Sequence, residues 1–161
     1  MTRSDDAKIQ WTGDETGAWT GLVRSGQGLL QSVETALKDS GLPPLSWYDV
    51  LWELEKARPT GLRLNDLGAR VLLDKYNVTR LVTRLEKEGL ARRKGCTGDG
   101  RGVFALITPK GARLRKRMWP VYSGTVREGF FSRLSPRETA SLRKLLGRVS
   151  GENGKSAAKS D

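Results

Sequence analysis

Apolar residues recur at three- and four-residue steps along most of this 161-residue chain. The longest series runs from Trp19 to Leu37, and Gly41 and Pro43-Pro44 follow it. Apolar residues at this spacing lie on one face of an α-helix, whereas glycine and proline end helices. The pattern therefore predicts a mostly α-helical fold that begins with a long amphipathic helix.

Two short stretches in the middle of the chain have the pattern of strands instead. Leu90–Lys94 and Val103–Ile107 enclose a glycine-rich segment, which predicts a β-hairpin. Three shorter helices are expected before this hairpin, and a long helix and a final helix after it. Pro120 lies within the long helix and is a position where it can bend. Residues suited to cap these five helices are Ser46, Asn65, Asp74, Thr108 and Ser135.

The composition excludes most common catalytic and metal chemistries. The chain has no histidine, so it lacks imidazole bases, histidine-activated nucleophiles and histidine metal ligands. Its single cysteine, Cys96, excludes an intramolecular disulfide and a cysteine zinc cluster. Carboxylate pairs such as Glu86 and Glu88 are two residues apart and do not face each other on a helix. We therefore expect a protein that is not an enzyme and has no cofactor.

Positive charge is concentrated in one part of the chain. Lysine and arginine total 29 against 18 acidic residues, a net charge of +11. Between Ala91 and Arg117 only Asp99 opposes nine cations. Such charge attracts polyanions, nucleic acid first among them. Since the chain has neither an apolar run that would span a membrane nor an apolar signal segment, and its cysteine is unpaired, a cytoplasmic location is expected.

The stretch from Leu45 to Gly111 resembles the MarR family of winged-helix transcription regulators. The resemblance rests on Leu45-Ser46-Trp47-Tyr48-Asp49-Val50-Leu51, on the segment from Asn77 to Arg93, and on Asp99-Gly100-Arg101 followed five residues later by Ile107-Thr108. It implies a homodimeric DNA binder, usually a repressor, that dimerises through its first, fifth and sixth helices. It also implies, for many members, a response to a small phenolic or aromatic acid bound between the dimer interface and the winged region.

The fourth predicted helix has the composition of a DNA recognition helix. Its apolar face is Val78, Leu81, Val82 and Leu85, and the opposite face is polar. Asn77 and Arg80 have side chains that make bidentate contacts to adenine and guanine, whereas Thr79 and Thr83 suit phosphates and Tyr76 suits either. A solvated helix face is the alternative, and Arg84 can instead pair with Asp66. The predicted contacts on this helix are Lys75, Tyr76, Asn77, Thr79, Arg80, Thr83 and Arg84.

The predicted wing adds a second set of DNA contacts. Arg101 is expected to enter the minor groove, and Asp99 to orient Arg101 or cap the turn. Arg92, Arg93 and Lys94 alternate along a strand, so they cannot all face the same phosphates, and they are expected to add affinity rather than sequence preference. Cys96 lies in the same segment, where it is either an oxidant-sensitive thiol or an incidental one.

A ligand site is predicted from the aromatic residues. Trp19, Trp47 and Trp52 are candidates to line an aromatic slot, and Arg24 is a candidate to bind a carboxylate. The alternative is that these tryptophans are part of the core.

The sequence therefore predicts a mostly α fold with a small β-hairpin wing, that is, a winged helix-turn-helix with long N- and C-terminal dimerisation helices. Residues 1–14 and 150–161 are expected to be disordered tails of a single domain, 15–149. Within it, 15–40 and 109–149 are expected to dimerise and 45–108 to bind DNA. The expected function is a homodimeric regulator of a pseudo-palindromic operator in double-stranded DNA, a repressor released by a small aromatic or phenolic ligand. The alternative is a non-specific nucleic-acid-binding or architectural protein without an effector.

Overall fold

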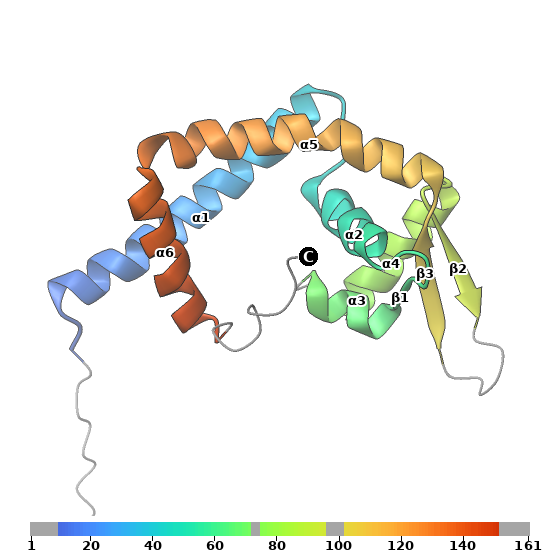
Figure 1. Cartoon of the computed structure of the whole chain (residues 1–161), viewed down its shortest axis with the longest axis horizontal. Coiled ribbons are helices and arrows are strands. Elements are labelled where there is room, and N and C mark those ends of the chain that lie inside the picture. The colour runs from blue at the N-terminus through green and yellow to red at the C-terminus, as the bar shows by residue number, and fades with distance from the viewer. Residues whose placement is uncertain (1–9, 72–74, 96–101, 152–161) are drawn as a thin grey trace, which may run out of the picture.

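The computed structural model describes residues 10–71, 75–95 and 102–151. Its elements in chain order are α1 (Gly13–Asp39), α2 (Leu45–Lys56), β1 (Leu62–Arg63), α3 (Leu64–Arg70), α4 (Lys75–Lys87), β2 (Ala91–Gly95), β3 (Val103–Ile107), α5 (Pro109–Gly129), the 3-10 turn η1 (Phe131–Arg133) and α6 (Pro136–Val149). Figure 1 shows α2, α3, α4 and the sheet gathered into one lobe, with α1, α5 and α6 extending from it as an arm. The predicted fold class, mostly helical with a winged helix-turn-helix, is confirmed.

The sheet has one strand more than the sequence predicts. Its order is β1-β3-β2, and both pairs are antiparallel. Between β1 and β3, Leu62 lies opposite Ala105, and between β2 and β3, Arg92 lies opposite Leu106. The wing is therefore a three-stranded sheet rather than an isolated hairpin, and its central strand β3 leads directly into α5.

Two apolar clusters hold these elements together. The larger one fills the lobe beneath α4, with Val78, Val82 and Leu85 fully buried. The smaller one joins α1 and α2 to α5 through Leu37, Tyr48 and Met118. α5 continues as a helix through Pro120, so a single rigid element connects the lobe to the arm.

The observed caps confirm two predictions and correct two others. Thr108 caps α5 and Ser135 forms the capping box of α6, as predicted. Ser46 does not cap α2, because α2 begins at Leu45 and the Glu34 carboxylate accepts from the Leu45 N–H at 3.2 Å. Asn65 does not cap α3, which begins one residue earlier at Leu64. Asp74 lies outside the described residues.

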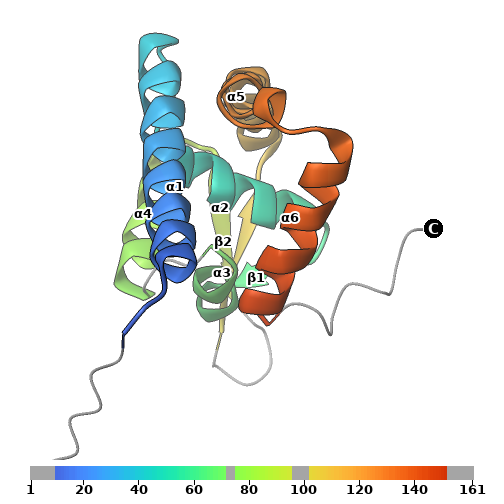
Figure 2. The same cartoon turned by 90° about the vertical axis from the view of Figure 1, so that its left-hand side faces the viewer.

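The arm leaves many large apolar side chains exposed. In Figure 2 α5 is seen along its axis, and α1 and α6 run on opposite sides of it. The exposed side chains in these elements are Trp19, Leu22, Leu30, Trp119, Phe131, Leu145, Leu146 and Val149. An apolar surface of this extent is typical of a protein–protein interface.

Candidate nucleic-acid interface

Helix α4 presents one polar face to solvent and buries the other. Val78, Val82 and Leu85 are fully buried in the lobe, whereas Asn77 and Arg80 are exposed on the opposite side. The last turn of the helix carries Arg84 and Lys87. A cationic, hydrogen-bonding helix face over a rigid apolar base has the shape and chemistry to enter a major groove.

Two open hollows flank this face. One, of about 530 Å³, runs along α4 itself and is lined by Thr79, Arg80, Thr83, Arg84 and Lys87. The other, of about 330 Å³, lies between α4 and the start of α2, and there Arg80 and Arg84 share the lining with Ser46. Sequence reasoning missed Ser46 as a member of this face, because it assigned the hydroxyl to a helix cap.

Arg93 lies against α4 and does not project freely from the wing. Its backbone N–H donates to Glu86 Oε1 at 2.8 Å, and its Nη1 is ion-paired with Glu86 Oε2. Its Nη2 donates to Thr83 Oγ1 at 2.8 Å and to the Thr79 carbonyl at 3.3 Å. Thr83 also donates to the Thr79 carbonyl, at 2.9 Å. The guanidinium that was predicted to support phosphate binding is thus engaged by three residues of the helix.

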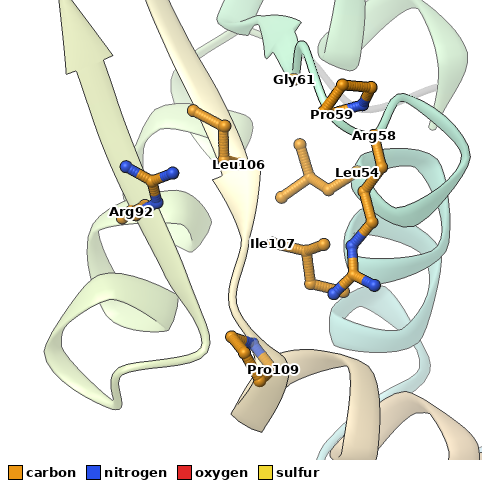
Figure 3. Close-up of a pocket in the computed structure, with 8 residues that line it drawn as sticks. All are labelled: Leu54, Arg58, Pro59, Gly61, Arg92, Leu106, Ile107 and Pro109. Carbon is orange, nitrogen blue, oxygen red and sulfur yellow. The ribbon is translucent and has the colours of Figure 1, made fainter.

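Arg92 faces the other side of the sheet. Figure 3 shows Arg92 on β2 and Arg58 from the loop after α2 at opposite sides of a hollow of about 340 Å³, with Leu106 and Ile107 between them. Lys94, two residues along the strand, is exposed. The alternation predicted for Arg92, Arg93 and Lys94 is therefore confirmed, since only Arg93 turns towards α4.

Several residues named in the sequence analysis are not described by the structure. Asp99, Arg101 and Cys96 fall outside the described residues, and so do the side chains of Lys75 and Tyr76. Among the ion pairs of the described residues, none joins Arg84 to Asp66. Arg84 instead lines both hollows beside α4.

The structure does not bring the four predicted ligand residues together. Trp19 lies on the arm, 54% exposed and edge-on to Trp11 at 6.3 Å between ring centroids. Arg24 is exposed on the same helix. Trp47 packs partly against the core of the lobe, whereas Trp52 is 40% exposed next to Arg115. Within one chain these four residues therefore lie in three separate places: on the arm, at the core of the lobe and next to Arg115.

Arg115 on α5 connects this helix to α2 and lies against two aromatic side chains. It is ion-paired with Glu55, and the side chains are only 11% and 19% exposed. Its guanidinium carbon lies 4.8 Å from the centre of the Trp52 ring and 6.0 Å from that of Tyr48. Sequence reasoning counted Arg115 with the DNA-attracting cations, but its charge is used inside the fold.

Acidic and phenolic groups near this junction have shifted pKa values. Burial raises the pKa of the Asp49 carboxyl, and the charges of Glu53 and Glu34 raise it further. Burial likewise raises the pKa of Tyr122, and to a lesser extent the nearby Asp49 does so too. Burial also raises the pKa of Tyr48, although Arg115 opposes this shift. The junction of α1, α2 and α5 therefore favours neutral forms of these side chains.

A further open hollow lies where the α1–α2 loop meets α5. Its volume is about 560 Å³, and Trp47, Leu42 and Leu114 contribute its apolar lining. Lys110, Arg113 and Arg117 add three cations from α5. Because only Thr108 separates the end of β3 from α5, these cations lie at the opposite end of β3 from its first residue, Val103 (Figure 1).

Metal binding and membrane insertion are two other roles on which the described residues bear. In the described ranges no group of three or more histidine, cysteine or acidic residues is arranged to hold a metal ion. Of the helices in those same ranges, none combines the length and the apolar character that crossing a membrane requires.

Comparison with known proteins connects this face to a family. The family model described as MarR family matches residues 40–102. AbsC, a MarR family regulator from Streptomyces coelicolor, superposes with a TM-score of 0.80 at 28% identity, covering 89% of this chain and 97% of AbsC. Sco3205, a MarR family regulator from the same organism solved in complex with DNA, gives 0.81 at 28% identity, covering 94% and 96%. The winged region of this chain therefore resembles the MarR family in sequence, and the chain as a whole has the fold of MarR family regulators.

The curated proteins that this chain matches are also transcriptional regulators. MhqR of Bacillus subtilis (strain 168) is 35% identical over 92 residues, which are 57% of this chain and 62% of MhqR. The uncharacterized regulator YkoM of the same strain is 34% identical over 84 residues, which are 52% of this chain and 54% of YkoM. The chain thus matches little more than half the length of these relatives, and neither they nor the family model indicates an enzyme.

Proposed function

We propose that this protein is a homodimeric, sequence-specific DNA-binding regulator in which α4 reads the major groove. The observation that carries the proposal is the outer face of α4, where Asn77 and Arg80 are exposed above a fully buried apolar base. Arginine and asparagine are the residues that make bidentate contacts to guanine and adenine. Sco3205, which is similar over 94% of this chain, was solved in complex with DNA.

Phosphate contacts would flank the base contacts. Thr79, Arg84 and Lys87 line the hollow along α4, and Ser46 lies at the start of α2 beside Arg80. Thr83 lines the same hollow, but its hydroxyl proton is donated to the Thr79 carbonyl, so Thr83 would have to release that bond to contact a phosphate. Lys75 and Tyr76 begin the same helix. The wing residues Arg92 and Arg101 would extend the contact to a neighbouring groove, with Asp99 orienting Arg101 or capping the turn. These contacts would fix the orientation of the protein on DNA without carrying sequence information.

The decisive experiment is selection of bound sequences from a random DNA pool at about 150 mM salt, which keeps purely electrostatic binding modest. We expect a pseudo-palindrome whose half-sites lie about 10 base pairs apart, because a dimer presents two recognition helices. Arg80→Ala should then relax the preference at one base pair by about 1–3 kcal/mol. Recovery of no motif by a folded dimer would refute specific reading and favour the architectural alternative.

The apolar arm supports the homodimer. Leu30 on α1 and Leu145 on α6 are each 55% exposed, although both belong to the apolar faces of their helices. We expect Leu145→Asp to convert the dimer to a monomer in light scattering, whereas Arg143→Asp, which introduces the same carboxylate at a polar position of α6, should leave it dimeric. A wild-type protein that is monomeric at micromolar concentration would contradict the proposal.

A small anionic effector with an aromatic body would fit the hollow beneath the α1–α2 loop. Trp47, one of the four predicted ligand residues, lines it together with Lys110, Arg113 and Arg117. Binding there would act on α5 and α2 together, which suits release of a repressor from its operator. The predicted slot formed by Trp19, Arg24 and Trp52 would instead require residues of a second chain.

Release of DNA by 2-hydroxybenzoate tests this assignment. We expect Arg113→Gln/Arg117→Gln to raise the concentration needed for half-release at least about tenfold, since two charge-assisted contacts are lost. Lys116→Gln removes an exposed cation of the same helix that does not line the hollow, and it should leave the concentration unchanged. Equal effects of both variants would place the effector elsewhere.

A further inference from the structure

Glu86 is an acidic residue on a helix face that borders the DNA-binding surface. It follows Thr79 and Thr83 on the same side of α4, seven and three residues later. An acidic group near phosphates ordinarily weakens DNA binding through repulsion. The contacts of Glu86 show that its charge has a different use in this protein.

The Glu86 carboxylate holds both the backbone and the side chain of Arg93. Oε1 accepts from the Arg93 N–H at 2.8 Å, and Oε2 is paired with the Arg93 guanidinium. Both side chains are less than one-third exposed, at 29% and 27%. The partial burial of this pair leaves the guanidinium little net charge to offer a phosphate.

The other terminal nitrogen of the guanidinium contacts α4 nearer its N-terminus. Nη2 donates to Thr83 Oγ1 at 2.8 Å and to the Thr79 carbonyl at 3.3 Å. Seven residues are about two turns of helix, so one side chain on β2 contacts α4 over about 10 Å of its length. Contacts at both ends of such a stretch resist sliding of the helix along β2 and rotation about its own axis.

We propose that Arg93, held by Glu86, is a positioning residue that sets the angle at which α4 presents Arg80 and Asn77 to DNA bases, and that it does not itself bind phosphate. Arg80 directly follows Thr79, and Arg84 directly follows Thr83, so a rotation of the helix moves both arginines. Bidentate base contacts depend on side chains held within about 10–20° of their productive orientation. This inference rests on the proposed function, since it concerns how the proposed reading helix is held.

Two conservative substitutions separate positioning from charge. Arg93→Lys keeps the charge but loses the planar fork that reaches Glu86, Thr83 and the Thr79 carbonyl together. Glu86→Gln keeps the size but cannot accept at both oxygens, because its amide nitrogen is a donor. The matched controls are Arg63→Lys, at an exposed arginine on strand β1 of the same sheet, and Glu88→Gln, which removes the same charge two residues later.

The assay is fluorescence anisotropy with the full-length protein, on the selected operator and on a scrambled duplex, at several salt concentrations. We expect Arg93→Lys and Glu86→Gln each to lower the ratio of operator to scrambled affinity about tenfold, the effect of losing a charge-assisted hydrogen bond. The slope of log affinity against log salt should stay within about half a unit of the wild-type slope, because no phosphate contact is lost. Arg63→Lys should keep the affinity ratio, and Glu88→Gln should tighten binding to both duplexes slightly.

Opposite results would overturn the inference. If Glu86→Gln tightens binding to both duplexes as Glu88→Gln does, or if Arg93→Lys keeps the ratio, Arg93 acts as a simple cation. Thermal unfolding of each variant identifies loss of fold, and Glu86→Gln, the milder change, then decides the matter. A wild-type protein that shows no preference between the duplexes refutes the proposed function itself, and this inference falls with it.

Discussion

The ion pair between Arg115 and Glu55 gives a prediction whose size follows from its burial. Arg115→Met keeps most of the side-chain volume but leaves the Glu55 carboxylate, only 19% exposed, without its partner. Removing one partner of a fully buried pair costs about 3–5 kcal/mol, and exposed pairs contribute about 0–1 kcal/mol. Because the Arg115–Glu55 pair is largely but not fully buried, removing Arg115 should cost about 3 kcal/mol, the lower end of the range for buried pairs. Loss of the contact between the guanidinium and the Trp52 ring adds about 0.5–1 kcal/mol.

We therefore expect Arg115→Met to lower the free energy of unfolding by about 3.5–4 kcal/mol and Glu55→Gln by about 2 kcal/mol. The double variant should lose about 1–2 kcal/mol less than the sum of the two, because it leaves no unpaired charge. Urea unfolding at one fixed protein concentration measures all three, since the proposed dimerisation would make stability depend on concentration. Lys116→Met, at the neighbouring exposed cation, should change stability by no more than about 0.5 kcal/mol. A coupling energy below about 0.5 kcal/mol would refute the argument that this pair joins α5 to α2.

Three further predictions concern stability. Gly111→Ala should lower the free energy of unfolding, measured in urea, by more than about 2 kcal/mol, because the added Cβ would lie 2.1 Å from the Leu90 carbonyl oxygen. The control Gly124→Ala, at a glycine with open space around it, should be neutral or stabilising. Thr108→Ala should cost about 1–2 kcal/mol, since it removes both the cap of α5 and a 2.7 Å hydrogen bond to the Gly89 carbonyl, and an unchanged urea midpoint would contradict this. The raised pKa of Asp49 means that the folded state keeps the proton that the unfolded state releases near pH 3.9, so stability falls as the pH rises above that value. Asp49→Asn should then stabilise at pH 7 and lose this advantage as the pH approaches about 4, whereas a destabilised variant at pH 7 would show that a cation from a second chain pairs with Asp49.

The features that sequence reasoning predicted well are those with a local physical cause. The strand Val103–Ile107 was predicted with its observed bounds, because an apolar run follows the glycine-rich segment. The caps at Thr108 and Ser135 involve residues three positions apart, so they are visible in the sequence itself. The α4 face was predicted because its apolar residues repeat at helical spacing and leave the polar residues opposite.

The features that it missed depend on contacts between distant parts of the chain. Strand β1 has only two residues and exists because Leu62 and Arg63 pair with β3, about forty positions later. Ser46 was expected to cap α2, but Glu34 fills that role from the preceding helix, eleven residues before Leu45. Arg93 was grouped with its charged neighbours because no short-range signal reveals that its strand lies beside α4. Sequence patterns thus predict which faces are polar, but not which cations are already engaged.

Gly111 has no room for a side chain beside the Leu90 carbonyl, and the Thr108 N–H donates to the same oxygen at 3.1 Å, so the first turn of α5 is joined closely to the start of β2. With 21 residues, this helix is about 31 Å long at ~1.5 Å per residue. A tilt of about 6° at one end therefore displaces the other by about 3 Å, close to the ~3.4 Å spacing between successive base pairs. If the proposed function holds, a tilt of this size would move the recognition helix by about one base-pair step along the DNA.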